Sequence, residues 1–278
     1  MIFTSSQRAA FRKGYRQMDP RYGQIICQSI FMAFGLAWLG WEARIVDFLL
    51  IFASCLTFQR LFEKWFKTGR NAWQSAMISS LSLCLMFKAG AWWALPVCGL
   101  LTVGSKFLIR YNGKHIFNPT NFGILVTILI TRMGWVSPGQ WGSALIFMIL
   151  IGALSLAVLF RVGRLDVAFS FLGVYAMMHF FYNYVILGWP MDYFLHQLSS
   201  GTLLLFTFFM ITDPMTTPRH AVARVAWAGL TGVLAFVLSG YMYIHTAPLW
   251  ALFFMSPLTP LFDTIFTAPR FTWQKVQA

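Results

Sequence analysis

The chain has 278 residues, of which 58% are hydrophobic, 18% aromatic and only 10% charged. Because soluble domains carry about 25% charged residues, this composition excludes an ordinary soluble enzyme and indicates a polytopic membrane protein in a lipid bilayer. The excess of 21 Lys+Arg over 8 Asp+Glu would suggest nucleic acid as the partner of a soluble protein. In a membrane protein the same excess is typical of cytoplasmic loops, so we expect no nucleic-acid partner.

Apolar runs between charges and turn-forming residues predict an all-α protein of about ten transmembrane helices. Since each crossing takes about 20 residues, ten of them would occupy most of the chain. The predicted helices are 25–41, 43–58, 72–87, 91–108, 119–131, 143–160, 166–188, 198–212, 223–243 and 247–266. Several are short for a full crossing, which favours tilted or broken helices.

The distribution of basic residues predicts how these helices are oriented. With the N-terminus in the cytoplasm, all Lys and Arg residues except Arg44, Lys88 and Arg132 fall on the cytoplasmic side, as the positive-inside rule requires. We therefore expect a basic cytoplasmic segment, one transmembrane domain and a cytoplasmic tail, at 1–24, 25–268 and 269–278. Two halves of five helices would run in opposite directions, which is the inverted-repeat arrangement of many transporters.

Few acidic residues lie within or next to the predicted helices. Asp47 lies just inside the second helix and is expected to pair with Arg44. Asp213 and Asp263 each follow or end a helix at the cytoplasmic side, in Pro-containing turns. Because a charge at the edge of the hydrocarbon is costly unless it faces the bundle interior or water, these two aspartates are candidates for a function.

The cysteines and histidines give little indication of a metal or haem site. The cysteines all fall in apolar segments without a Cys-x-x-Cys pair, which predicts small core residues. They are Cys27, Cys55, Cys84 and Cys98. No pair of histidines has the spacing of a metal or haem site on a helix.

The fifth predicted helix begins with an unusual string, Phe117-Asn118-Pro119-Thr120-Asn121. Pro119 suits the first helical turn, and Asn118 has the residue type of an N-cap. Asn121 follows about one turn later on the same face, so the two amides and Phe117 could instead bind a planar heteroaromatic ligand. The pattern itself leaves both interpretations, helix capping and ligand binding, open.

Five strings of the chain occur in the order of a known membrane family. They are Asn71–Leu85, Phe117–Pro119, Arg164–Gly173, Ser200–Pro214 and Pro260–Asp263. In these strings the chain resembles the RnfD/NqrB family, which comprises the membrane D subunit of the Rnf electron-transport complex and the B subunit of the sodium-pumping NADH:quinone reductase. The first 70 residues match this family only as general membrane spans.

The resemblance implies ten helices in a five-plus-five inverted repeat, similar to urea and ammonium channels, in the bacterial inner membrane with both termini cytoplasmic. It also implies a non-covalent flavin near the cytoplasmic side, riboflavin in preference to FMN. Asn118 and Asn121 would hold the isoalloxazine edge, beside Phe117. Thr212 and Asp213 are weaker candidates for the same pocket. The partners expected from the same resemblance are redox partner subunits or domains, and a quinone that exchanges electrons with the flavin.

One departure from the family pattern concerns its second flavin. In the family, an FMN is esterified to a threonine in a Ser-x-Ala-Thr motif within a long insertion after the fifth helix. Here that stretch is only Thr131–Gly142 and has no such motif. The sequence therefore predicts no covalent FMN and a shortened electron path, so that the chain either uses a partner's flavin or haem domain or has lost electron transfer.

Three functions remain open at this point. The first is an electron-transfer subunit of an oxidoreductase complex, in preference to a complete enzyme, because no residue is a recognisable nucleophile or general base. The second is a transporter or channel for flavin or another small polar solute, built on the same inverted-repeat scaffold. The third is a scaffold subunit without a cofactor.

Overall fold

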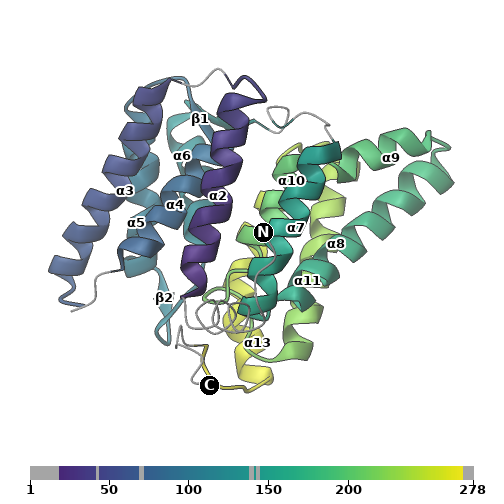
Figure 1. The fold of residues 1–278 in the computed structure, drawn as a ribbon. Coiled ribbons are helices and arrows are strands. Elements are labelled where there is room, and N and C mark those ends of the chain that lie inside the picture. Colours follow the sequence, from purple (N-terminus) through teal and green to yellow (C-terminus); the bar gives the residue numbers. More distant parts are fainter. Residues whose placement is uncertain (1–18, 42–43, 69–71, 138–140, 142–144, 272–278) are drawn as a thin grey trace, which may run out of the picture.

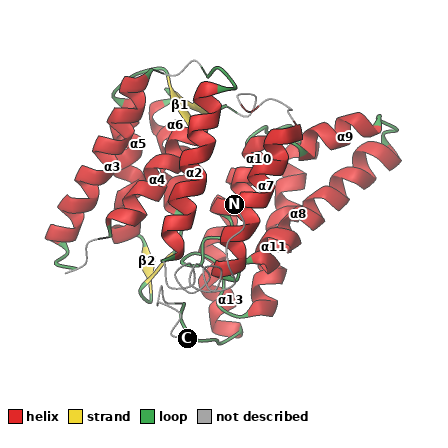
Figure 2. Ribbon diagram, in the orientation of Figure 1, coloured by secondary structure: helices red, strands yellow, loops and turns green. Residues whose placement is uncertain are grey.

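The computed structural model describes residues 19–41, 44–68, 72–137, 141 and 145–271, and within these the chain is predominantly helical. Figure 1 shows two groups of helices side by side, with α2 and α7 in contact where the groups meet. Figure 2 shows that strands make only minor contributions at the helix ends.

The first group contains the helices up to residue 131. They are α2 (Pro20–Ala37), α3 (Ile45–Trp65), α4 (Trp73–Met86), α5 (Ala94–Leu108) and α6 (Pro119–Thr131). Two short antiparallel ladders connect them: β1 (Phe87–Ala89) pairs with β4 (Gly134–Val136), and β2 (Arg110–Tyr111) pairs with β3 (Lys114–His115). The second ladder is a tight hairpin between α5 and α6, with Asn112 and Gly113 at positive φ in its turn.

The second group contains the remaining helices, several of which change their winding. They are α7 (Leu145–Val162), α8 (Leu165–His179) with η2 (Phe180–Ile186), α9 (Met191–Leu198), α10 (Gly201–Leu205) with η3 (Phe206–Met210), α11 (Ala221–Phe236) with η4 (Val237–Tyr241), and α12 (Ala247–Met255) with η5 (Ser256–Leu258) and α13 (Thr259–Ile265). Three of the continuations, η2, η3 and η4, are π-helical. Such wide turns are uncommon and often lie at functional sites.

Each predicted helix has a counterpart in the structure, with three main differences. Helix α2 covers Pro20–Ala37 and not the predicted 25–41, because Asp19 caps it and Pro20 occupies its first turn, so the helix begins within the predicted 1–24 segment. Helix α3 extends to Trp65, beyond the predicted end at 58, because Gln59 and Glu63 join successive turns through a hydrogen bond of 2.9 Å. The amphipathic helix α9 was not predicted, because its eight residues are too short and too polar for a crossing. A helix can therefore continue beyond the edge of the bilayer. Charged residues indicate where the bilayer ends, but they do not indicate where the helix ends.

Three helices among the described residues are long and apolar enough to cross a membrane, namely α3, α8 with η2, and α11 with η4. Shorter apolar helices lie at Ala94–Leu108, Pro119–Thr131, Ile151–Val162 and Gly201–Met210. Many large apolar side chains are exposed, among them Ile45, Val46 and Leu49 on α3, as expected for surfaces that face lipid. Ten crossings and an inverted repeat remain predictions.

The interior is packed through small residues and buried apolar side chains. A Cβ added to Gly123 on α6 would collide with Thr102 on α5, and one added to Gly99 would collide with Ser54 on α3. Small residues of this kind allow membrane helices to approach closely. The four cysteines are buried and free within this core, which confirms their predicted role as small core residues.

Candidate functional site

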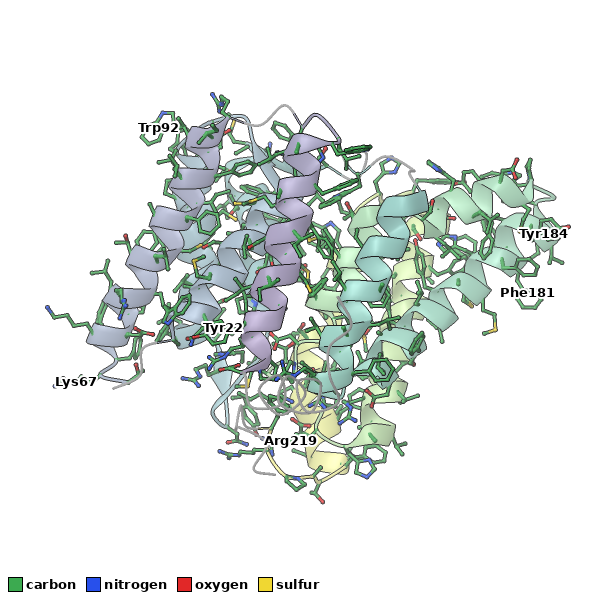
Figure 3. The ribbon with its side chains drawn as sticks, viewed as in Figure 1. Tyr22, Lys67, Trp92, Phe181, Tyr184 and Arg219 are labelled. Carbon is green, nitrogen blue, oxygen red and sulfur yellow. The ribbon has the colours of Figure 1, made fainter. Side chains whose placement is uncertain are left out.

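A cavity of about 1010 Å³ lies toward the end of the molecule that holds β2 and α13 in Figure 1. It lies along α4 from Ser75 to Met86, among the starts of α2 and α6, the ends of α3, α5 and α7, and the segment from η3 to Met215. Figure 3 places Tyr22 and Arg219 at this end of the molecule and Trp92 at the opposite end. The lining includes the polar side chains of Gln28, Gln59, Glu63, Ser75, Lys106, His115, Asn118, Thr212 and Asp213.

Asn118 is the N-cap of α6, as one of the two interpretations of its motif predicted. Its side-chain oxygen accepts a hydrogen bond of 3.1 Å from the main-chain N–H of Asn121, and Pro119 occupies the first turn. The side-chain amide donates to the main-chain oxygen of Met210 at 3.1 Å and approaches a carboxylate oxygen of Asp213 at 3.5 Å. Asn118 therefore joins two segments that are far apart in the sequence.

Asp213 and Thr212 lie in the turn that follows η3, and both are cavity-lining residues. One carboxylate oxygen of Asp213 accepts a hydrogen bond from the N–H of Met215 at 2.9 Å, and burial raises the pKa of this carboxyl. The Thr212 hydroxyl donates to the main-chain oxygen of Phe208 at 2.7 Å. The turn is thus held rigidly by its own hydrogen bonds, and Asp213 is an acceptor at the cavity wall.

Asn121 and Phe117 do not line this cavity. The Asn121 amide donates to the main-chain oxygen of Leu249 in α12 at 3.1 Å, and its side-chain oxygen is buried without a hydrogen-bond partner. Phe117 stacks on Phe253, with ring centroids 4.9 Å apart, and packs against Phe122. The five residues predicted for a flavin site therefore divide into three at the cavity and two that fix the start of α6 against α12.

Three further cavity residues were not identified from the sequence. Gln28 donates to the Ser82 hydroxyl at 2.8 Å and Gln59 donates to Glu63, and both side-chain amide oxygens are buried without a partner. Lys106 is buried in α5. The signal that could have identified the glutamines is their position within otherwise apolar helices, whereas Lys106 was assigned to a cytoplasmic connection.

Asp263 has a different environment from Asp213, although their sequence contexts are similar. It accepts hydrogen bonds from the ammonium of Lys114 at 2.9 Å and from the main-chain N–H of Arg219 at 2.8 Å. Lys114 also donates to the main-chain oxygen of Thr217, and burial lowers its pKa. Asp263 thus fastens the β2–β3 hairpin to α13, while the predicted pair of Asp47 and Arg44 is present as an exposed contact of 3.1 Å.

Comparison with known proteins identifies the family. The model of the NQR2, RnfD, RnfE family matches residues 126–272, which is more than half of the chain. The chain belongs to this family. The match covers the motif segments around Arg164, Asp213 and Asp263, and the resemblance inferred from the sequence is confirmed. Family membership and the long apolar helices together make the chain an integral membrane protein.

Two curated relatives share short stretches with the chain, and each is named as the D subunit of an ion-translocating oxidoreductase complex. The one from Stutzerimonas stutzeri is 37% identical over 71 residues, which are 26% of this chain and 20% of the relative. The one from Halorhodospira halophila (strain DSM 244 / SL1) is 34% identical over 67 residues, 24% of this chain and 19% of the relative. The aligned stretch thus spans about a fifth of each relative's length.

Proposed function

We propose that the chain is a flavin-binding membrane subunit of an electron-transport system, with a non-covalent flavin in the cavity beside Asn118. Riboflavin is proposed in preference to FMN. The observation that carries the proposal is the meeting of Asn118 with Thr212 and Asp213 at one cavity wall, from segments that the family resemblance had singled out. The names of the two relatives, both subunits of an oxidoreductase complex, support the electron-transport part.

The chemistry of the cavity wall suits a flavin. The volume of about 1010 Å³ is at the upper end of the range for sites of small molecules and cofactors, roughly 300–1,000 Å³. The unpartnered buried oxygens of Gln28 and Gln59 are acceptors, which match the ring N–H and the ribityl hydroxyls. Phe208 and Phe209, which also line the cavity, supply apolar area for the ring. A buried acceptor without a partner is costly, so a ligand donor there would be stabilising.

The proposed roles of the residues follow from their bonds. Asp213 accepts a hydrogen bond from the ligand. The side-chain amide of Asn118, which approaches Asp213 at only 3.5 Å, donates a hydrogen bond to the ligand. Thr212, whose hydroxyl is bonded within its own turn, contributes shape. Asn121 and Phe117 lie outside the cavity and fix the start of α6 through their contacts with Leu249 and Phe253 of α12. When bound, a flavin supplies exchange of one or two electrons with other redox groups.

The remaining features of the proposal rest on the sequence. No covalent FMN is proposed, because Thr131–Gly142 has no Ser-x-Ala-Thr motif; residues 138–140 and 142 of this stretch lie outside the described part of the chain. Redox partner subunits and a quinone are proposed as electron donors and acceptors. The proposed location is the bacterial inner membrane, with ten helices, both termini cytoplasmic, and 1–24 and 269–278 outside the bilayer.

A binding titration tests the site. The full chain in detergent is titrated with riboflavin, and the quenching of riboflavin fluorescence gives the dissociation constant. Asn118→Ser keeps an N-cap oxygen but removes the amide, so we expect binding at least tenfold weaker. The matched control is Asn112→Gly, which removes an amide in the hairpin turn at positive φ and should leave binding unchanged. Equal affinity of Asn118→Ser and the wild type would contradict the site.

The large cavity between the helix groups, whose wall carries several polar side chains, also favours a second candidate, a transporter or channel. In that case flavin or a small polar solute would be the cargo. Proteoliposomes that contain the chain alone would then accumulate labelled riboflavin without a redox partner. Tight binding without accumulation supports the electron-transfer subunit instead.

A further inference from the structure

Lys106 is a buried cation in the cavity wall. Its side chain lines the cavity, and the residue is only 5% exposed. The ammonium donates to the main-chain oxygen and to the hydroxyl of Ser75 on α4, both at 3.0 Å. An ammonium has three donors, so one is left over after these two bonds. Among the described residues no carboxylate forms an ion pair with it.

The two cavity carboxylates are engaged elsewhere. Glu63 accepts from the amide of Gln59 at 2.9 Å and from the main-chain N–H of Ala72 at 2.7 Å. Asp213 accepts from Met215 and faces Asn118. By contrast, the partly buried Lys114 contacts Asp263 directly at 2.9 Å. The ammonium of Lys106 therefore lies in a wall whose two carboxylates, Glu63 and Asp213, accept hydrogen bonds from other donors.

A charged side chain inside a membrane helix is expensive and marks functional sites. A buried charge that lacks a partner is also destabilising, because Coulomb attraction does not offset its lost hydration. Ser75 supplies two neutral acceptors, which satisfy hydrogen bonds but do not balance the charge. The arrangement is suited to a ligand that brings a negative charge next to α5.

We propose that Lys106 is the residue that holds the negative charge of the reduced ligand, so that the cavity binds reduced flavin more tightly than oxidised flavin. The inference rests on the proposed function. The oxidised ring is neutral, and uptake of two electrons and one proton from an external reductant leaves the ring with one negative charge. Lys106 keeps its own proton and stabilises that charge. It is a residue that tunes the ligand's redox state, distinct from Asn118 and Asp213, which fix its position.

The test compares affinities for the two redox states in the full chain in detergent. Riboflavin fluorescence quenching gives the affinity for the oxidised form, and a potentiometric titration with dithionite and mediator dyes gives the midpoint potential. Lys106→Met should lower the ratio of reduced to oxidised affinity at least tenfold. For a two-electron couple this is a fall of about 30 mV in the midpoint potential. Lys106→Arg should restore the ratio.

The matched control is Lys88→Met, which removes a half-buried lysine that lies over the rings of Trp41 and Phe48 away from the cavity. It should leave the ratio unchanged. Ligand-free Lys106→Met should melt no lower than the wild type, because a buried charge is removed. If both Lys106→Met and Lys106→Gln fail to fold, Lys106 is a structural cation and the inference is overturned.

The remaining outcomes separate this inference from the proposed function. A wild-type chain that binds riboflavin in neither redox state overturns both. A wild-type chain that binds riboflavin, with an unchanged ratio in Lys106→Met, overturns only the assignment of Lys106. The chain could also prefer FMN to riboflavin and lose this preference in Lys106→Met, with an unchanged ratio of reduced to oxidised affinity. Lys106 would then bind a phosphate group, and its assignment to the reduced ring would be overturned.

Discussion

The side-chain amide of Asn118 donates a hydrogen bond of 3.1 Å to the main-chain oxygen of Met210, across 92 positions of the sequence. This bond links the N-terminus of α6, in the first helix group, to the end of η3 in the second. The same side chain caps α6 through its oxygen. One residue thus fixes both the start of a helix and the position of the turn that carries Asp213, and the cavity wall depends on it.

Substitutions at Asn118 should separate its two structural roles. Asn118→Ala removes the cap and should cost about 1 kcal/mol more than Asn118→Ser, which keeps a capping oxygen. Asn118→Asp also caps, but it places a second carboxylate near Asp213, so it should melt below Asn118→Ser at neutral pH. Thermal melts in detergent, followed by circular dichroism, measure this order. Equal melting temperatures of the Ala and Ser variants would contradict the capping role.

Removing the charge of Asp263 should destabilise the hairpin end of the molecule. Asp263→Asn leaves Lys114, whose side chain is 13% exposed, without its counter-charge. Because both side chains are largely but not fully buried, we expect a loss of about 2–3 kcal/mol. Asp47→Asn in the exposed Arg44 pair is the control and should cost under about 1 kcal/mol. Similar losses in the two variants, measured by denaturant unfolding, would show that the buried pair contributes no more than the exposed one.

His115 should make the protein less stable in acid. Burial, with the neighbouring charges of Arg110 and Lys106, lowers the pKa of His115 to about 3, from an ordinary value of 6.5. Between these values the unfolded chain binds a proton that the folded chain excludes, so stability falls as the pH decreases from about 6.5. The maximum slope for one proton is about 1.4 kcal/mol per pH unit.

His115→Gln removes this proton uptake and should flatten the dependence of unfolding free energy on pH between 7 and 4.5. The difference between the two curves isolates His115, because Asp213, whose pKa is raised by burial, contributes equally to both. The exposed His245→Gln serves as the control and should retain the wild-type slope. Parallel curves for the wild type and His115→Gln would refute the prediction.

His179 is the centre of a buried polar network in the second helix group. Its Nε2 lies 2.9 Å from the Ser239 hydroxyl, and its Nδ1 lies 3.3 Å from the Asn183 amide, which also donates to Gln197 at 3.1 Å. Ser239 also donates to the main-chain oxygen of Ala235, and the amide nitrogen of Gln197 lies 3.4 Å from His179 Nε2, so three polar side chains surround the ring. The network joins η2 and η4, whose wide turns bring these side chains together.

His179→Leu should cost about 1–3 kcal/mol, because Asn183 and Ser239 are left with unsatisfied groups in the interior. The exposed His196→Gln on α9 should change stability by less than about 0.5 kcal/mol. Denaturant unfolding in detergent measures both. A His179→Leu variant as stable as the wild type would mean that the network contributes nothing net to folding.

Hydropathy and capping residues predicted most helices, because both signals depend only on residues that are close in the sequence. Pro119 and its preceding asparagine mark the start of α6 at the predicted residue, because capping depends on neighbours in the sequence. The end of α3 was wrong because a helix continues past the last apolar residue wherever side chains such as Gln59 and Glu63 bond along it. The π-helical segments depend on packing between distant helices and had no local signal.

Only some residues of the cavity wall could be predicted, because the others depend on packing between helices. Thr212 and Asp213 could be connected with Asn118 through the order of motifs, and the structure brings them to one wall. Lys106 could not, because a lysine near a predicted helix end looks the same whether it points to water or into the bundle. Only the position of α5 beside α4, with Ser75 within hydrogen-bond distance, distinguishes the two.

The central claim is that the chain carries a non-covalent flavin, and a visible absorption spectrum of the detergent-purified protein tests it most directly. Acid extraction and mass spectrometry then identify what is released. We expect flavin absorption bands, riboflavin in the extract and an unmodified protein mass. A colourless protein that stays colourless after addition of riboflavin and FMN would contradict it.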